Sequence, residues 1–185
     1  MDLWRVCVWL PGETDTARNG HPAFVWPRQG HGRVDDPEHD YLVLYLGDSP
    51  VGAIAEYLGD YARWTPAVLE PPPAAPTGSR LGLARYTFTG SILDLDDPEV
   101  LSEWALRPSS VVTRDRGITQ RWARAIHDSG EYAGVSWWSH RDPRWASLGV
   151  WDRAQLRVSD EVEELTLVHP ALIEASHVIS RVVET

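Results

Sequence analysis

The sequence predicts a protein of the α+β class, in which helices are inserted among short strands. Short apolar runs bounded by turn-forming residues are typical of strands, and stripes of apolar residues at helical spacing lie between them. These elements do not alternate regularly, as they would in a doubly wound sheet. With 185 residues, a hydrophobic share of 43% and ten tryptophans, the chain is expected to form a single domain over residues 1–185.

The first part of the chain contains two predicted strands that flank a long irregular segment. Residues 3–10 predict the first strand, and the wholly apolar run 41–46, YLVLYL, predicts a strand covered on both faces. Between them, residues 11–40 are rich in Gly, Pro, His and Arg. Loops of that length in compact domains are often functional, so this segment is a candidate source of binding residues.

The helix predicted to follow carries a candidate catalytic residue, Glu56. Ser49 is a favourable N-cap and Pro50 suits the first helical position. The apolar stripe of this helix consists of Val51, Ile54, Ala55 and Leu58. Glu56 lies off that stripe, and three of its four neighbours at helical spacing are small, so another group can approach it closely; the neighbours are Gly52, Ala53, Gly59 and Asp60.

The remaining elements are predicted from the same two periodicities. A Pro- and Ala-rich stretch at 66–79 predicts a surface loop within the domain. Strands are predicted at 85–89, 91–95, 134–138, 148–151, 155–158 and 163–168, and helices from Asp97 to about 106, from Thr119 through Asp128 and over 171–183.

Charge and cysteine content narrow the classes of function. The net charge of −10 would repel a phosphate backbone, so no direct contact with nucleic acid is expected, and a small anion would need a local cluster of arginines. The single cysteine, Cys7, lies in an apolar strand and is expected to be a buried, inert thiol, consistent with a reducing compartment. The sequence has no signal-peptide pattern and no apolar run of about 18 residues, which predicts a cytoplasmic protein without a membrane span.

Four side chains are suited to a binding or catalytic site. Arg33, in GHGRVDDP, can fork onto a phosphate or ribose oxygen, and Tyr45, at the end of the second strand, can stack on a flat ring. Glu56 offers a carboxylate, and Ser139 follows the strand GVSWW. Each also has an ordinary structural interpretation: an arginine paired with an aspartate of GRVDD, a core aromatic, a solvated helix residue and a turn serine.

Several other constellations are excluded. SHRD at 139–142 has the residue types of a hydrolase triad, but Ser139 and His140 as strand neighbours are expected to point to opposite faces. No GxSxG motif occurs. The seven histidines show no zinc-ligand spacing, so no metal is expected, and the lack of GxGxxG and P-loop motifs argues against a Rossmann-type nucleotide site.

Taken in order, the segments resemble the RES domain, a family named for its Arg, Glu and Ser. The resembling segments are WRV at 4–6, GRVDD at 32–36, LYLGDSPVGAIAE at 44–56, ILDLDD at 92–97 and ITQRWARAIHDSGEYAGVSWWSHRDP at 118–143. The middle segment is similar to the family pattern L-Y-A-x-S-x-x-x-A-x-x-E in the spacing from Tyr45 to Glu56. The resemblance covers residues 3–155.

The resemblance implies the site residues and their roles. The family's Arg, Tyr, Glu and Ser fall on Arg33, Tyr45, Glu56 and Ser139, and its first Arg falls on Arg5. Glu56 would lie near the positive charge that develops on the ribose, and Arg33 with Arg5 would hold pyrophosphate or inorganic phosphate. Tyr45 would stack on nicotinamide, and Ser139 would orient the ribose or Glu56.

The resemblance also implies a fold and an activity. The fold would be similar to that of ADP-ribosyltransferases, a split and twisted β core with inserted helices that clasps NAD. The activity would be cleavage of NAD+ at the nicotinamide–ribose bond, by phosphorolysis to nicotinamide and ADP-ribose-1''-phosphate or by hydrolysis. NAD+ would be the substrate and inorganic phosphate a candidate co-substrate, with no prosthetic group. RES proteins are typically toxins of toxin–antitoxin pairs, so a helix-turn-helix antitoxin is an expected partner, and homo-oligomer formation stays open.

Two alternatives to this activity stay open. A protein ADP-ribosyltransferase would use the same four residues, and a degenerate, non-catalytic member would only bind a partner or a nucleotide. The matched polar positions are all filled, which favours a catalytic protein.

Overall fold

In the computed structural model, which describes residues 1–184, two sheets and two groups of helices form the fold. The strands are β1 (Asp2–Trp9), β2 (Leu44–Gly47), β3 (Arg63–Trp64), β4 (Arg80–Phe88), β5 (Ile92–Asp94), β6 (Gly134–Trp138), β7 (Ala146–Val150), β8 (Leu156–Glu164) and β9 (Val182–Val183). The helices are α1 (Pro50–Leu58), α2 (Pro98–Glu103), α3 (Pro108–Val111), α4 (Arg116–Ser129) and α5 (Pro170–Val178). In the described part of the chain, no helix has the length and apolar character needed to cross a bilayer.

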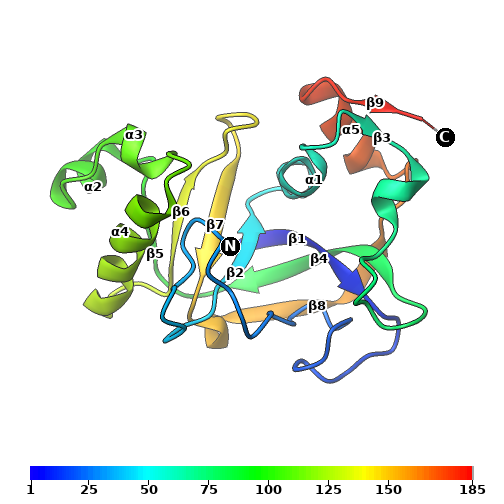
Figure 1. Cartoon of the computed structure of the whole chain (residues 1–185), viewed down its shortest axis with the longest axis horizontal. Helices are drawn as coiled ribbons and strands as arrows, with labels where there is room; N and C mark the ends of the chain where they lie inside the picture. The colour runs from blue at the N-terminus through cyan, green and yellow to red at the C-terminus, as the bar shows by residue number, and fades with distance from the viewer. Residues whose placement is uncertain (185) are drawn as a thin grey trace.

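The larger sheet has seven strands in the order β5-β6-β7-β2-β1-β4-β8 and forms the curved centre of the molecule (Figure 1). Its neighbours run antiparallel, except for β5 and β6, which are parallel. A second, two-stranded sheet pairs β3 with β9 in parallel. This mixed sheet with helices inserted between its strands confirms the predicted α+β class.

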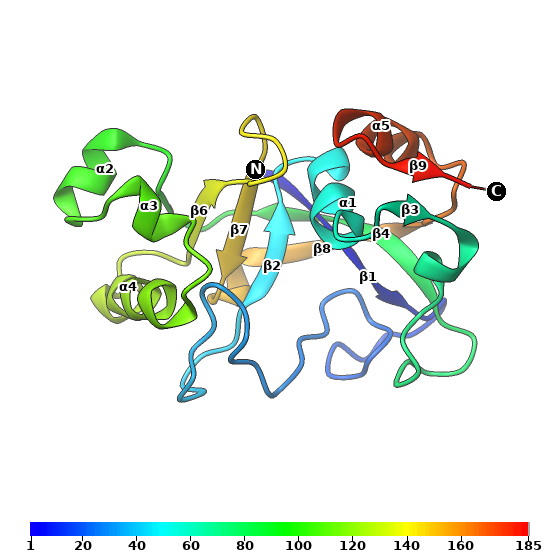
Figure 2. The same ribbon diagram turned by 45° about the horizontal axis from the view of Figure 1, so that its top comes forward.

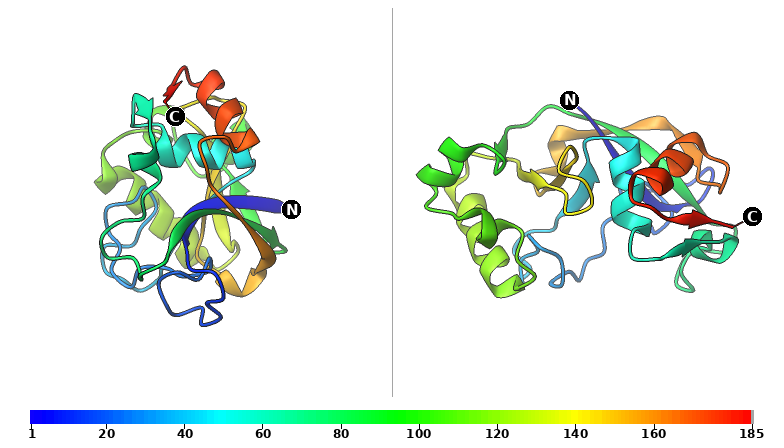
Figure 3. Two further views of the ribbon diagram at one scale, coloured as in Figure 1. Left: turned by 90° about the vertical axis from the view of Figure 1, so that its right-hand side faces the viewer. Right: turned by 90° about the horizontal axis from the view of Figure 1, so that it is seen from above.

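Two groups of helices cover different parts of the large sheet (Figures 1 and 2). Helices α2, α3 and α4 lie near β5 and β6, around a core that includes Leu93, Trp122 and Val135. Helices α1 and α5 pack together near β1 and β4, around a core that includes Ile54 and Leu83. Seen from above, in the right-hand view of Figure 3, the two groups lie toward opposite ends of the molecule, with the central strands between them.

Helix α1 begins and packs as the sequence predicts. The Ser49 side chain accepts a hydrogen bond from the Gly52 nitrogen (3.0 Å), and Ile54 on the predicted apolar stripe is fully buried. Gly47, the last residue of β2, lies so close to α1 that a Cβ there would be 3.1 Å from the Ala53 nitrogen. This tight connection holds the first turn of α1 against the end of β2.

The start of α4 differs from the prediction. Thr119 does not cap the helix, because α4 begins at Arg116 after Asp115, and Thr119 is completely buried within it. Asp115 and Thr119 are both residue types that favour the N-cap position. The earlier start places Thr119 on the same buried face as Trp122 and Ala123, so tertiary packing decides between the two.

The strands after the surface loop also differ in their bounds. The strand predicted at 155–158 continues to Glu164 as β8, because its pairing with β4 continues through a shift of register between Ala84 and Tyr86. Of the strand predicted at 163–168, only residues 163 and 164 belong to β8, and residues 165–168 lie outside any strand. Strand β4 begins at Arg80, earlier than predicted, and the loop at 66–79 includes a 3-10 turn at Pro66–Leu69.

Two predicted helices are shorter in the structure. The helix predicted over 171–183 ends at Val178, since Ser180 has a left-handed backbone φ of 54° that turns the chain, and Val182 then begins β9. The helix predicted to about 106 is interrupted in the same way at Ala105, whose φ is 51°, and α3 follows as a separate turn of helix.

The segment between β1 and β2 contains no helix or strand, but its side chains fasten it to the fold. The side-chain amide of Gln29 donates a hydrogen bond to the Val43 carbonyl and accepts one from the Val43 nitrogen, at 2.7 Å each. For this reason the strand predicted at 41–46 enters the sheet only at Leu44. Val34 is completely buried, in a space left by the missing side chain of Gly149.

Asp36 is a second fastening point of this segment and is 2% exposed. Its carboxylate accepts hydrogen bonds from the nitrogens of Glu38 (3.1 Å) and Asp40 (2.7 Å) and from Arg124 (3.0 Å). Burial opposes ionisation, but these hydrogen bonds and the charge of Arg124 together lower the pKa of Asp36 below its ordinary value of 3.8. A carboxyl group whose pKa is lowered by folding stabilises the folded protein above its ordinary pKa, and this contribution is lost as the pH falls through the folded-state pKa.

We predict that Asp36→Asn lowers the free energy of unfolding by about 1–3 kcal/mol at neutral pH, because an amide cannot accept all three hydrogen bonds. The difference from the wild type should shrink below pH 3.8, where the wild type loses the same charge. Urea unfolding followed by tryptophan fluorescence measures both effects. Asp128→Asn is the matched control, since this exposed carboxylate binds the same Arg124 and should contribute much less to stability. Equal losses in the two variants would contradict the interpretation.

Candidate active site

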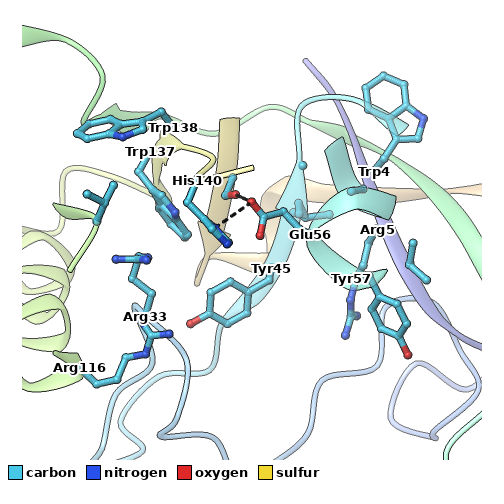
Figure 4. Close-up of a pocket in the computed structure, with 16 residues that line it drawn as sticks. Trp4, Arg5, Arg33, Tyr45, Glu56, Tyr57, Arg116, Trp137, Trp138 and His140 are labelled. Carbon is cyan, nitrogen blue, oxygen red and sulfur yellow. Dashed lines mark hydrogen bonds and ion pairs between the residues drawn. The ribbon is translucent and has the colours of Figure 1, made fainter. Parts of the chain in front are cut away.

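A cavity of about 420 Å³ opens where β1, β2 and the ends of β6 and β7 meet α1 and the segment before α4 (Figure 4). Its volume is in the range of small-molecule sites. Its aromatic walls are formed by Trp4, Tyr45, Tyr57, Trp137 and Trp138, and its polar lining includes Arg5, Arg33, Glu56, Arg116, His140 and Ser147. Four of the five predicted site residues therefore line one cavity, and the fifth, Ser139, is buried and bonded to Glu56.

Glu56 occupies the middle of this cavity in Figure 4. Its Oε1 accepts hydrogen bonds from the hydroxyls of Ser139 and Ser147, the latter at 3.4 Å, and Nδ1 of His140 lies 3.9 Å away. Among residues 1–184, no group donates a hydrogen bond to Oε2. The protein thus orients the carboxylate through one oxygen and leaves the other for a ligand.

The small neighbours of Glu56 allow this arrangement. A Cβ on Gly52 would lie 3.1 Å from the Trp145 ring, and one on Gly59 would lie 2.6 Å from Nε of Arg141. Both contacts come from the segment that joins β6 to β7. The space predicted around Glu56 is therefore filled by this segment, which also carries Ser139.

Ser139 and His140 are arranged differently from the expectation that they point to opposite faces. Strand β6 ends at Trp138, so the alternation of side chains no longer applies after it, and both residues approach Glu56. The Ser139 hydroxyl accepts a hydrogen bond from the Arg141 nitrogen (3.0 Å) and donates to Glu56 rather than to His140. The geometry is that of a serine that orients a carboxylate.

Tyr45 is held in the cavity wall through its hydroxyl. This hydroxyl donates to Asp35 (2.7 Å) and accepts from the nitrogen of Val34 (3.1 Å), and Asp35 also accepts from the nitrogens of Gly30 (2.8 Å) and Gly32 (2.7 Å). A Cβ on Gly32 would lie 2.2 Å from the Tyr45 oxygen, so this close approach requires glycine. Burial, and after it the charge of Asp35, raise the pKa of Tyr45, which keeps the hydroxyl protonated.

Arg33 also lies against Trp137, with its Cζ over the indole ring at 5.8 Å from the centroid. Its Nη1 donates to the carbonyls of Val111 and Thr113, the latter at 3.0 Å. It does not pair with the aspartates of GRVDD, which are engaged elsewhere. Burial, and then the positive charge of Arg116, lower the pKa of Arg33. The guanidinium remains charged, because arginine keeps its proton far above neutral pH.

The other two arginines of the cavity lie on different sides of Glu56 in Figure 4. Arg5, from β1, donates to the carbonyls of Pro22 (3.1 Å) and Phe24 (3.0 Å). Arg116, from the first position of α4, lies on the side of Arg33. In the described part of the chain, none of Arg5, Arg33 and Arg116 forms an ion pair with a carboxylate.

This charge pattern runs against that of the whole protein. The chain has a net charge of −10, yet its cavity gathers three arginines around one glutamate. Together with aromatic walls, such a cavity suits a flat, partly cationic ring joined to anionic groups. Among the side chains that the structure describes, no group of three His, Cys, Asp or Glu residues is placed to hold a metal ion.

Sequence reasoning missed the other residues that line the cavity, among them Trp137, His140, Ser147 and Arg116. Trp137 and Ser147 resemble ordinary strand residues in the sequence, and they become neighbours of the site only through the pairing of β6 with β7. Arg116 offers one local signal, since a cation at the start of a helix opposes the helix dipole and calls for another explanation.

Comparison with curated proteins gives no match. Among solved structures, a chain of the crystal structure of the M. tuberculosis MbcT-MbcA toxin-antitoxin complex is similar in fold, with a TM-score of 0.59 and 15% sequence identity over 97% of this chain and 88% of that chain. The family model of the RES domain matches residues 2–169, a range that includes the whole cavity. With most of its length matched by that model, the chain belongs to the RES domain family.

Proposed function

We propose that the protein consumes NAD+ by breaking its nicotinamide–ribose bond. The observation that carries this proposal is Glu56, held through one oxygen by serine hydroxyls in a cavity of arginines and aromatic rings. A carboxylate so placed stabilises positive charge, and the arginines attract phosphate. NAD+ brings together a cationic ring, a ribose and a pyrophosphate, which match these three features.

In the proposed reaction, the bond between ribose C1'' and the nicotinamide nitrogen breaks, and its electron pair leaves with nicotinamide. The ribose then carries positive charge, as in glycoside cleavage. Glu56 stabilises this charge through Oε2 or by gripping a ribose hydroxyl, and Ser139 and Ser147 keep its carboxylate in one orientation. Because the carboxylate is oriented before the reaction, it needs little reorganisation as charge develops.

The cavity walls provide binding. The edge-to-face contact of Tyr45 with Trp137, at 6.4 Å between ring centroids, keeps the Tyr45 ring upright in the wall, where nicotinamide can pack on it. Arg33 and Arg5 supply charge-assisted hydrogen bonds for phosphate oxygens. An oxygen of inorganic phosphate or of water then bonds to C1'' and its proton is released to solvent, giving ADP-ribose-1''-phosphate or ADP-ribose.

We further propose that the protein is the toxin of a toxin–antitoxin pair that acts on the cytoplasmic NAD+ pool. Family membership and the similarity in fold to a toxin–antitoxin complex support this role. The single buried thiol, Cys7, whose pKa burial raises to about 11, is unreactive and suits a reducing compartment. A helix-turn-helix antitoxin is the proposed partner.

Glu56→Gln should reduce NAD+ consumption at least about 100-fold, because the neutral amide no longer stabilises the ribose cation. The purified variant is assayed for NAD+ loss by nicotinamide release, and its expression should no longer arrest growth. Glu103→Gln, which changes an exposed helix glutamate away from the cavity, is the control and should behave as wild type. Full NAD+ turnover by the Glu56 variant would overturn the assignment.

Ser139→Ala should lower kcat by about 10-fold while KM changes little, because it removes one hydrogen bond that orients Glu56 but no contact with substrate. Steady-state kinetics with NAD+ separates the two constants. Ser91→Ala is the control, because it removes a hydroxyl that donates to the Glu131 carbonyl and does not line the cavity. It should change neither kcat nor KM. A change confined to KM would show instead that Ser139 contacts the substrate.

Product analysis decides the acceptor. The products of a reaction with NAD+ are identified by mass spectrometry, with and without phosphate. If phosphate is the acceptor, ADP-ribose-1''-phosphate should form when phosphate is present. If water is the acceptor, ADP-ribose should form in both reactions. We expect nicotinamide in both cases. Labelled NAD+ in a cell lysate tests transfer to protein, and a labelled band without free ADP-ribose products would replace this proposal by protein ADP-ribosylation.

A further inference from the structure

We propose that Arg116 and Arg33 together form a binding site for a phosphate group, with Arg116 as a substrate-binding residue. The inference deepens the proposed function and rests on it for the nature of the substrate. The phosphate group would belong either to the pyrophosphate of the dinucleotide or to free inorganic phosphate. Both sources present the same tetrahedral set of anionic oxygens, and the experiment below separates them.

The first observation is the state of the Arg116 side chain. It lines the cavity, and its Nη1 is buried from solvent. Among the residues that the structure describes, this nitrogen has no hydrogen-bond partner. A buried charged donor without an acceptor is costly, and the cost is recovered when an anion draws the guanidinium into hydrogen bonds.

The second observation is the position of Arg116 in its helix. It is the first residue of α4, where the helix dipole disfavours a cation. Apolar packing does not account for it either, since the buried face of α4 consists of Thr119, Gln120, Trp122, Ala123 and Ile126. Neither helix formation nor the core thus explains an arginine at this position, whereas an anion in the cavity does.

The third observation is the neighbour of Arg116. Figure 4 shows Arg33 and Arg116 on the same side of the cavity, opposite Arg5. Burial and, after it, the charge of Arg116 lower the pKa of Arg33, so the two guanidiniums repel each other. Arg33 is nevertheless fixed to the carbonyls of Val111 and Thr113, in the segment that leads into α4. The fold therefore holds two positive charges, those of Arg33 and Arg116, on one side of the cavity. Among the described residues, no carboxylate forms an ion pair with either.

A phosphate group satisfies these conditions better than other small anions. Its oxygens can accept forked hydrogen bonds from two guanidiniums at once, and its charge relieves their repulsion. The net charge of −10 on the chain weakens attraction for anions in general, so a local pair of arginines is needed to overcome it.

The test measures binding by titration calorimetry, with ADP-ribose and inorganic phosphate as separate probes. Neither probe contains the nicotinamide–ribose bond, so the result is independent of turnover. We expect Arg116→Gln to lower the affinity for one or both probes on the order of 10–100-fold. Loss for ADP-ribose alone assigns the site to the dinucleotide pyrophosphate, loss for phosphate alone assigns it to the free ion, and loss for both shows that the site accepts either.

The matched control is Arg121→Gln, which removes the same charge from an exposed position farther along α4. If Arg116→Gln binds both probes as tightly as this control, the proposal is wrong. Arg116→Lys keeps the charge but loses the fork, and should show a smaller loss. If Arg116→Gln fails to unfold cooperatively, unchanged binding by Arg116→Lys overturns the proposal. If binding of the probes depends on Arg116 but the wild-type protein does not consume NAD+, the phosphate site is supported and the proposed reaction is rejected.

Discussion

The hydrogen bond from Ser139 to Glu56 joins the two parts of the molecule between which the cavity lies. Glu56 belongs to α1, which packs with α5, and Ser139 follows β6, which packs with the helices at the other end of the sheet. The contact is possible because β7 and β2 alone separate β6 from β1 in the sheet, and because Gly52 and Gly59 let the chain after β6 lie on α1. A side chain larger than hydrogen at either glycine would push this segment away from the carboxylate.

A second carboxylate, that of Asp35, has a comparable role on the other wall. It gathers two backbone nitrogens of the irregular segment and the hydroxyl of Tyr45. The chain between β1 and β2 is thereby held in one conformation without regular secondary structure, and Arg33 leaves it toward Trp137. Two carboxylates thus organise the site, one facing the ligand and the other fixing the loop.

Electrostatics divides this protein into an acidic exterior and a cationic cavity. Carboxylates of the described surface pair with other arginines, such as Arg63, Arg80 and Arg85. Arg5 and Arg33 donate to backbone carbonyls, and Nη1 of Arg116 has no hydrogen-bond partner in the described chain. Their charge is therefore available to a ligand, and a phosphate-bearing substrate is the ligand class that this distribution favours.

Features with a local cause could be predicted from the sequence. Ser49 starts α1, apolar spacing buries Ile54, and small residues at helical spacing leave room around Glu56; each depends on neighbours within two turns. The order of the family's motifs pointed to Arg33, Tyr45, Glu56 and Ser139 as one group. The bounds of α4 and β8 were less predictable, because two residues could cap the helix and polar residues continue the strand.

The partners of the site residues were decided by the tertiary structure. Glu56 meets the Ser147 hydroxyl across 91 residues of sequence, and Arg33 reaches the Thr113 carbonyl across 80. Trp137 enters the cavity only because the sheet order brings β6, β7 and β2 side by side. A residue pattern states which groups can bond, but the distance between them depends on how distant strands pair, and that pairing follows from burial of the whole core rather than from any one segment.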